Sequence, residues 1–371
     1  MQRRSFLKKT GLGLAAGAVA APAIVKAQSP TVSWRMAGSW PKSLDTLFGT
    51  MEHISKRVSE ATGGKFNIKV FGAGEIVGGL QVLDAVQNGT VECGHTATYY
   101  YFGKDPTFAL NCSPPFGMNA RQQNAWMYHG GGMELFNEFY KDYNCLNFPA
   151  GNTGCQMGGW YRKEIKTLAD LKGLKFRVSG FAGLALTKLG VVPQQIAGGD
   201  VYPALEKGTI DAAEWVGPYD DEKLGFYKVA KYYYYPGWWE AGTQASLLVN
   251  IKAFQALPKE YQTILESVCA DANVWMMAKY DAVNPDALKR LIANGVQLRP
   301  FSNEIMAACY KAAKEVYAEI SGKNAKFKKV YDAMVKFQTD EVQWFSVAEN
   351  RMGNFMSAVE RMEQHEVKRK K

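Results

Sequence analysis

The 371-residue chain has few residues of the kinds that bind transition metals or carry redox chemistry. It contains four histidines and six cysteines, and no two histidines stand at metal-ligand spacing. No two cysteines form a C-x-x-C motif, which excludes a thioredoxin-type centre and a zinc ribbon. We expect most cysteines to be small buried apolar residues. They are Cys93, Cys112, Cys145, Cys155, Cys269 and Cys309.

Catalytic motifs are also missing. The chain has no Gly-x-Ser-x-Gly turn and no histidine in a recognisable triad context. The glycine-rich stretch FGAGEIVGG at 71–79 lacks the spacing of a dinucleotide-binding loop and the lysine of a P-loop. The sequence therefore favours a protein that is not an enzyme. An exported enzyme without a known motif is the alternative.

Long apolar runs are confined to the N-terminus. An arginine pair at 3–4 precedes an apolar run at 12–24 and a small-residue cleavage site near Ala27. This order is typical of a twin-arginine signal peptide, and the run is too short to span a bilayer comfortably. We expect residues 1–27 to be removed and the mature protein to reside in the periplasm.

A large net charge is missing from the mature chain. The formal charge of the whole chain is +9, and the predicted signal peptide holds five basic residues and no acidic ones, so about +4 remains after cleavage. Four of the remaining positive charges lie in the last four residues, 368–371. Nucleic acid requires a wide basic face, so we expect no nucleic-acid partner.

Strand and helix patterns alternate in the first part of the chain. Alternating apolar residues predict strands at 32–38, 65–72 and 89–98, and helical spacing predicts helices at 44–60 and 80–87. This order is typical of an α/β fold with a mostly parallel sheet.

An internal similarity suggests two lobes. AVQNGTVECGH at 85–95 and ALEKGTIDAAE at 204–214 each read as a short helix, a Gly-Thr turn and an apolar strand, and GGKFNIKVFG at 63–72 resembles GLKFRVSG at 173–180. The similarity predicts two α/β lobes that present strand ends to a shared cleft, where such sheets bind ligands. Chance likeness between two common βαβ units is the alternative.

The last part of the chain is helical. Helical patterns occur near 258–290 and 303–321, and apolar residues recur every three or four positions from 327 to 362. The last pattern predicts an amphipathic helix of about 50 Å if it is unbroken. Such a helix must brace both lobes, bend, or pack on another subunit.

Polar side chains interrupt the predicted strands at two places. Arg177 lies in GLKFRVSGF just before a helix start, where it either reaches the surface or binds a carboxylate through its planar fork. Asn152 and Gln156 lie in GNTGCQMGGWY at 151–161. They either face outward from an edge strand or contribute to a site.

Three segments together resemble the solute receptors of tripartite ATP-independent periplasmic (TRAP) transporters. They are FGAGEIVGGLQVLDAVQNGTVECG (71–94), LADLKGLKFRVSG (168–180) and VYPALEKGTIDAAEWVGP (201–218). The resemblance covers essentially the whole mature chain. It implies a two-lobed α/β solute-binding protein with crossing segments and a long C-terminal helix, and a salt bridge from Arg177 to the ligand. The implied partners are the small and large membrane subunits of the transporter. A homodimer through the C-terminal helix is one of the alternatives that the length of that helix leaves open.

The same resemblance divides the chain. We expect residues 28–150 to form mainly the first lobe, completed by a return strand near 241–254, and residues 151–240 to form mainly the second lobe. Residues 255–324 are expected to bridge the lobes. Residues 325–371 are expected to form the long C-terminal helix and a basic tail.

One segment departs from the common family pattern. Much of the family has Gln-Glu-Asn-Pro after the second Gly-Thr strand, whereas this chain has AEWVGP at 213–218. This resembles the branch that binds 2-oxo or 2-hydroxy monocarboxylates, pyruvate-like or lactate-like, together with a metal ion. A dicarboxylate or sugar acid bound by Arg177 without metal is the alternative.

That branch implies a set of site residues. A Na⁺ or Ca²⁺ ion, which prefers oxygen ligands, is expected to bind Gln156, Glu214, the carbonyl of Trp215 and Glu240. A surface position is the alternative for Glu214 and for Glu240. The expected ligand contacts are Arg177, Asn152, Gln156, Trp215 and one of Tyr99, Tyr100 and Tyr101.

Overall fold

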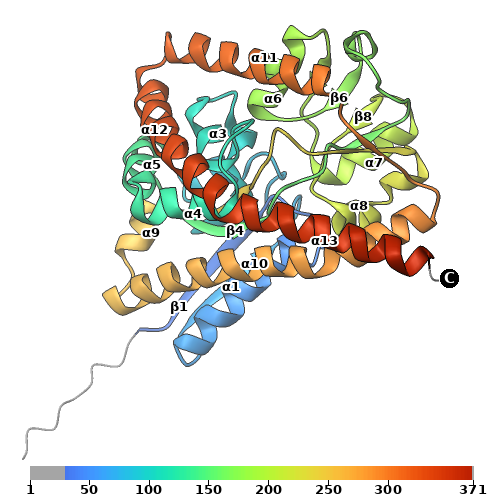
Figure 1. Ribbon diagram of the computed structural model, residues 1–371. Helices are drawn as coiled ribbons and strands as arrows, with labels where there is room; N and C mark the ends of the chain where they lie inside the picture. The colour runs from blue at the N-terminus through green and yellow to red at the C-terminus, as the bar shows by residue number, and fades with distance from the viewer. Residues whose placement is uncertain (1–29, 370–371) are drawn as a thin grey trace, which may run out of the picture.

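The computed structural model describes residues 30–369 and shows two lobes, each built on a β-sheet covered by helices (Figure 1). The predicted signal peptide, 1–27, lies outside the described residues. No helix within 30–369 has the length and apolar character needed to cross a membrane. All six cysteines belong to this part of the chain and are free thiols, and all but Cys155 are buried.

The first lobe contains a five-stranded sheet in the order β2-β1-β3-β10-β4. These strands are Phe66–Phe71, Val32–Gly38, Cys93–Ala97, Gln244–Asn250 and Cys145–Asn152. Helix α1 (Leu47–Ala61) packs beside β2 because Met51, Ile54 and Val58 recur at helical spacing and are buried on one face. Helix α10 (Lys259–Ala293) packs on β4 and α1, so it belongs to this lobe along much of its length.

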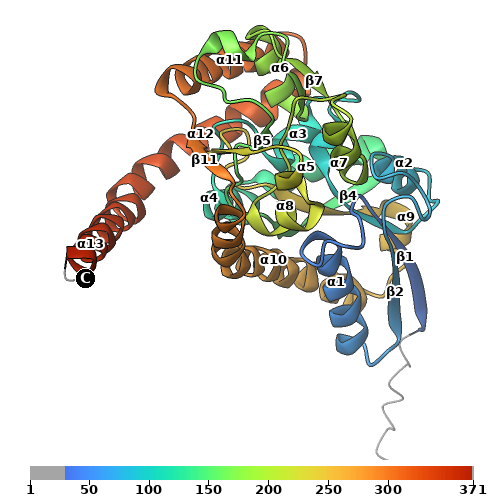
Figure 2. The same ribbon diagram turned by 90° about the vertical axis from the view of Figure 1, so that its right-hand side faces the viewer.

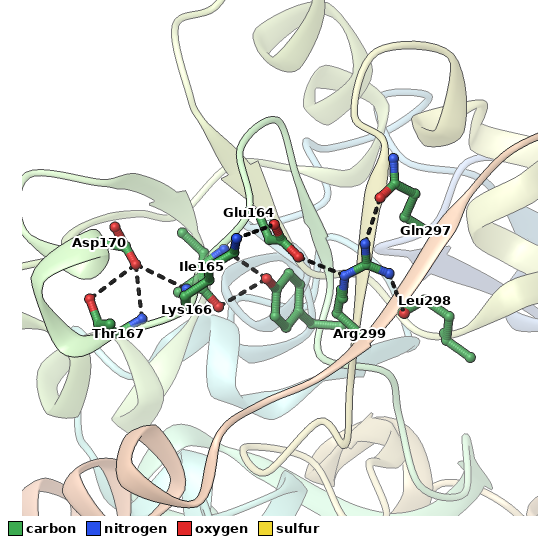
Figure 3. A network of polar contacts seen from close by, with 9 residues as sticks. Glu164, Ile165, Lys166, Thr167, Asp170, Gln297, Leu298 and Arg299 are labelled. Carbon is green, nitrogen blue, oxygen red and sulfur yellow. Dashed lines mark hydrogen bonds and ion pairs between the residues drawn. The ribbon is translucent and has the colours of Figure 1, made fainter.

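The second lobe contains a six-stranded sheet in the order β11-β9-β5-β8-β6-β7. These strands are Gln297–Pro300, Tyr232–Tyr235, Trp160–Tyr161, Ala212–Ala213, Lys175–Arg177 and Val192–Gln194. At the edge of the sheet, Arg299 of β11 donates to Glu164 at 2.7 Å (Figure 3). The Tyr234 hydroxyl bridges the backbone N–H and carbonyl of Ile165. These contacts attach the loop that follows β5 to the outer strands.

Both sheets are mostly parallel, as predicted above, and each contains one strand that runs antiparallel to its neighbours. Strand β10 is antiparallel to β3 and β4, and β5 is antiparallel to β8 and β9. The reason is the path of the chain. Each of these two strands is reached by a segment that crosses from the other lobe, not by a helix returning within the same lobe.

Two of the crossing segments run side by side. Residues 153–159 lead from β4 to β5, and residues 236–243 lead back from β9 to β10. Backbone hydrogen bonds join them in antiparallel fashion, from Thr153 N to Thr243 O, from Gln156 N to Glu240 O and from Gly237 N to Gln156 O, each 3.0 Å long. The pairing fixes the side chains of the two crossings relative to each other. Helix α10 makes a third crossing and ends before β11.

The remaining helices pack on the two sheets or on one another. They include α2 (Val82–Gln87), α3 (Thr107–Cys112), α4 (Ala120–His129), α5 (Gly132–Tyr140), α6 (Gly180–Lys188), α7 (Gly198–Glu206), α8 (Pro218–Leu224), α9 (Ile251–Gln255) and α11 (Asn303–Ser321). The helix patterns predicted near 258–290 and 303–321 correspond to α10 and α11.

The C-terminal amphipathic pattern forms two consecutive helices, α12 (Ala325–Val347) and α13 (Glu349–Arg369), which meet at Ala348. The first part of α12 is buried through Phe327, Val330 and Met334. Helix α13 extends away from the lobes (Figure 2), and several of its apolar side chains are exposed.

Candidate functional site

A narrow cavity lies where the paired crossings meet the strand ends of both lobes. It leaves about 10 Å³ for the centres of water molecules, roughly the room that one water needs. Its walls are Trp40, Leu47, Ala97, Tyr99, Tyr100, Thr153, Gln156, Trp215, Val216, Thr243 and Ala245. A larger depression of about 330 Å³ lies between α11 and α12, but the buried polar groups described next gather around the crossings.

Arg177 is the last residue of β6 and is fully buried beside this cavity. Its Nε donates to the Ile196 carbonyl at 3.1 Å, and its Nη1 donates to the Glu214 carbonyl at 2.9 Å and forms an ion pair with the Glu214 carboxylate. Its Nη2 is buried and has no hydrogen-bond partner within residues 30–369. The protein therefore holds Arg177 through Nε and Nη1, and Nη2 is left to donate to another group.

Trp215 covers the guanidinium. The Arg177 Cζ lies 5.0 Å from the centroid of the Trp215 ring, a cation–π arrangement that favours the charged arginine. The ring packs over Gly198, where an added Cβ would come within 2.3 Å of it. The indole Nε1 is buried and makes no hydrogen bond in the described part of the chain.

Glu214 and Glu240 are two buried carboxyl groups near one arginine. Burial raises the pKa of Glu214, and the nearby Arg177 limits the rise. Burial and then the charge of Glu214 raise the pKa of Glu240 well above its ordinary value. One guanidinium balances only one carboxylate, so a further positive charge would be needed to keep both carboxyl groups ionised.

Gln156 and Glu240 are brought together by the paired crossings. The Gln156 Nε2 donates to the hydroxyls of Thr153 at 3.2 Å and Thr243 at 3.0 Å, and the Thr243 hydroxyl donates to Glu240 at 3.1 Å. These contacts orient the amide so that its Oε1 is buried without a partner among the described residues. The Glu214 Oε2 is likewise buried without a partner among the described residues.

These oxygens suit a hard cation. Na⁺ and Ca²⁺ bind carboxylate, amide and main-chain oxygens, and Ca²⁺ takes six to eight of them. Within residues 30–369 there is no cluster of three or more His, Cys, Asp or Glu side chains that could hold a metal. The carboxylates of Glu214 and Glu240 and the amide of Gln156 are oxygen donors of the kind that Na⁺ and Ca²⁺ prefer.

The other predicted ligand contacts differ in whether they reach the cavity. Asn152 ends β4 and is buried; its Oδ1 accepts from Gly154 N at 2.9 Å, and its Nδ2 has no partner within the described residues. Tyr99 and Tyr100 line the cavity. Burial raises the pKa of Tyr100 to about 12, against the nearby charge of Arg177. The Tyr101 hydroxyl instead pairs with Thr96 at 2.9 Å and accepts from Leu83 N, so it does not reach this cavity.

Sequence reasoning missed Trp40 and Thr243. Trp40 follows the end of β1, and its indole donates to His95 Nδ1 at 2.7 Å, while His95 Nε2 lies 3.0 Å from the Ala150 carbonyl. Burial lowers the pKa of His95 to about 4, so His95 stays neutral and orients Trp40. The strand-end rule could have pointed to Trp40, but the partner of Thr243 depends on pairing between distant segments.

Comparison with known proteins shows a family. The model of the bacterial extracellular solute-binding proteins of family 7 matches residues 36–324. The monocarboxylate 2-oxoacid-binding periplasmic protein of Nostoc sp. strain PCC 7120 is 50% identical over 363 residues, which cover 96% of this chain and 100% of that protein.

Two solved structures extend the comparison. A TRAP transporter solute-binding protein from Bordetella bronchiseptica RB50, a mixed-occupancy dimer with copurified calcium and picolinate in one active site, is 54% identical with a TM-score of 0.88. The match covers 89% of this chain and 98% of that one. A TRAP periplasmic solute-binding protein from Pseudoalteromonas atlantica T6c with bound sodium and pyruvate is 39% identical with a TM-score of 0.85, covering 87% and 99%.

Proposed function

Because this chain belongs to the bacterial extracellular solute-binding proteins of family 7, we propose that it binds a small 2-oxo or 2-hydroxy monocarboxylate together with Na⁺ or Ca²⁺. It is a receptor for a TRAP transporter and not an enzyme. The observation that carries the ligand assignment is a set of buried polar atoms that have no partner within residues 30–369: an arginine donor, Arg177 Nη2, and two acceptor oxygens, Glu214 Oε2 and Gln156 Oε1. An anion and a cation bound side by side would satisfy both sets. The bound ligands of the related structures support the same assignment.

The residues divide the work of recognition. Arg177 binds the ligand carboxylate through Nη2, and Asn152 donates from its amide to the same molecule. Tyr99, Tyr100 and Trp215 exclude water and limit the length of the ligand. Glu214, Glu240, Gln156 and the carbonyl of Trp215 provide the cation ligands. A bound Na⁺ or Ca²⁺ supplies positive charge to which the carboxylate and the 2-oxo or 2-hydroxy oxygen of the ligand both coordinate.

The two lobes hold the ligand between them and release it to the membrane subunits. Arg177 and Glu214 come from the second lobe, whereas Trp40 and Tyr99 come from the first, so a ligand that contacts all four favours the closed arrangement. The proposal includes the lobe limits predicted from the sequence: residues 28–150 with a return strand near 241–254 for the first lobe, and residues 151–240 for the second. The twin-arginine signal with cleavage near Ala27 would place this receptor in the periplasm.

Calorimetric titration of pyruvate into the mature protein tests the proposal. After refolding in EDTA, we expect pyruvate to bind at least about 100-fold more weakly without cation than with NaCl or CaCl₂, because buried carboxylates then stay uncompensated beside the ligand. Choline chloride at equal ionic strength is the control. Binding indifferent to cation would remove the metal from the site. No binding of pyruvate or lactate, with binding of a dicarboxylate or a sugar acid, would contradict the ligand class.

We further propose a homodimer formed through α13. Apolar side chains are exposed along the end of α12 and α13, with Phe355 and Met352 each more than 60% exposed, and such a surface marks an interface. Deleting residues 349–371 removes this helix and leaves the buried residues of α12 in place. We expect a folded monomer by light scattering, with unchanged pyruvate affinity. A dimer that survives the deletion, or a full-length monomer, would contradict the interface.

A further inference from the structure

Helix α8 carries two consecutive buried aspartates that contact different lobes. The Asp221 carboxylate accepts from Trp160 Nε1 at 2.9 Å and from the Tyr233 hydroxyl at 2.7 Å, both in the second sheet. The Asp220 carboxylate accepts from the Thr46 hydroxyl at 2.6 Å and from the Tyr280 hydroxyl at 2.6 Å. Thr46 precedes α1, and Tyr280 lies in α10. Asp221 therefore anchors α8 within its own lobe, and Asp220 anchors it to the first lobe.

Charged groups surround this contact on the surface. Asp45, next to Thr46, forms ion pairs with Lys223 of α8 and with Lys279 of α10, the latter at 2.7 Å. The Tyr219 hydroxyl of α8 donates to the Asp45 carboxylate at 3.2 Å. The pKa of Asp45 is lowered to about 2, because the two lysines outweigh the opposing effect of burial. The segment before α1 thus contacts α8 through two adjacent residues, Asp45 and Thr46, beside the contact made by Tyr280 of α10.

Both sides of the contact continue directly into the candidate site. On the second lobe, α8 begins at Pro218, and only Gly217 separates it from Glu214, Trp215 and Val216. On the first lobe, Thr46 is followed by Leu47, which lines the cavity. A change in the distance between α8 and Thr46 would therefore move the two walls of the cavity relative to each other.

We propose that Asp220 is a positioning residue, which holds Glu214 and Trp215 against the first lobe through Thr46 and Tyr280 and thereby sets the lifetime of the bound ligand. We name this contact, made by Asp45, Thr46, Asp220, Lys223 and Tyr280, the α8 clasp. Its effect on binding rests on the proposed function, whereas its formation between the lobes does not.

The α8 clasp is stabilised by hydrogen bonds to a buried carboxylate. Asp220 is fully buried, and burial raises its pKa to about 6 while Thr46 and Tyr280 lower it. At pH 7.5 the carboxylate is therefore mostly ionised and accepts from both hydroxyls. Removing either hydroxyl leaves a buried charged oxygen without its donor, which is more costly than losing a neutral hydrogen bond.

The test compares the same chemical change at two neighbouring aspartates. Tyr280→Phe removes a donor to Asp220, and Tyr233→Phe removes a donor to Asp221. Thr46→Val and Thr46→Ser form a second pair, in which serine retains the hydroxyl. At pH 7.5 with CaCl₂, stopped-flow fluorescence should show pyruvate dissociating about 10-fold faster from Tyr280→Phe and Thr46→Val, and at close to the wild-type rate from Tyr233→Phe and Thr46→Ser.

A ligand-free arm keeps the clasp separate from the proposed function. A carbodiimide joins carboxylates to lysines in direct contact, so mass spectrometry of the treated protein should find Asp45 linked to Lys223 across the lobes and to Lys279. Thr46→Val should lower the first product and leave the second, which serves as an internal control. This arm stands even if wild-type protein binds no pyruvate, a result that would overturn the proposed function alone.

Two outcomes would overturn the clasp. One is a wild-type protein in which Asp45 links to Lys279 but not to Lys223, since the lobes would then not meet at α8. The other is equal acceleration of pyruvate release by Tyr280→Phe and Tyr233→Phe, because the effect would then come from general loosening of α8.

Discussion

Arg177→Met is expected to weaken pyruvate binding by at least about 100-fold, measured by calorimetry with saturating CaCl₂. The guanidinium is fully buried, and its Nη2 is free of partners within the described chain, so a ligand carboxylate would be held by a charge-assisted hydrogen bond away from water. Removing one partner of such a buried pair typically costs about 3–5 kcal/mol, because the other charge stays buried and uncompensated. The planar guanidinium also fixes the direction of its hydrogen bonds, which a lysine ammonium does not. Arg177→Lys should therefore recover only part of the affinity.

Arg299→Met is the matched control for this experiment. Arg299 lies in the same lobe and also pairs with a glutamate, Glu164, but at the exposed edge of the sheet (Figure 3). Exposed ion pairs contribute about 0–1 kcal/mol, so this variant should bind pyruvate like the wild type. The double variant Arg177→Met/Glu214→Gln tests folding, since it removes both buried charges. If Arg177→Met is folded and binds pyruvate with wild-type affinity, the arginine does not hold the ligand.

The parts of the fold that the sequence predicted depend on local patterns. The α/β alternation, the helices α10 and α11 and the position of Arg177 beside a helix start can each be found within about ten residues of sequence. The resemblance of three segments then supplied the two-lobed family fold. Asn152 and Gln156 stand out because they are polar residues in a strand-like run of small residues.

The parts that escaped prediction depend on pairing between distant residues. The crossings at 153–159 and 236–243 pair across more than eighty positions, and this pairing places one antiparallel strand in each sheet and joins Thr243 to Gln156. Three adjacent tyrosines cannot be ranked from sequence, because only the turn at 98–101 decides which rings face the cavity. The long C-terminal pattern keeps its period through Ala348, where the chain changes direction between α12 and α13.

Glu214→Gln is expected to abolish the cation dependence of binding. Glutamine keeps the size of the side chain and one oxygen that can accept from Arg177, but it removes a negative charge from the cluster with Glu240. A cation would then lose one of its two anionic protein ligands, and Arg177 its ion pair, so pyruvate affinity with CaCl₂ should fall by at least about 100-fold. The remaining affinity should be the same with CaCl₂ and with choline chloride. Thermal unfolding with pyruvate, scanned with each salt, measures the same difference where calorimetry lacks sensitivity.

The control and the contradicting result separate the cation from the anion site. Glu92→Gln removes an arginine partner of the same kind, since Glu92 pairs with Arg35 at 2.8 Å on the exposed side of the first lobe, and it should leave cation dependence intact. A Glu214→Gln protein that still needs CaCl₂ or NaCl for pyruvate would show that Glu240, Gln156 and the Trp215 carbonyl hold the cation without Glu214. In that case Glu214 would only hold Arg177 in place, and Glu240 would bind the cation. Each carboxylate would then pair with a different positive charge.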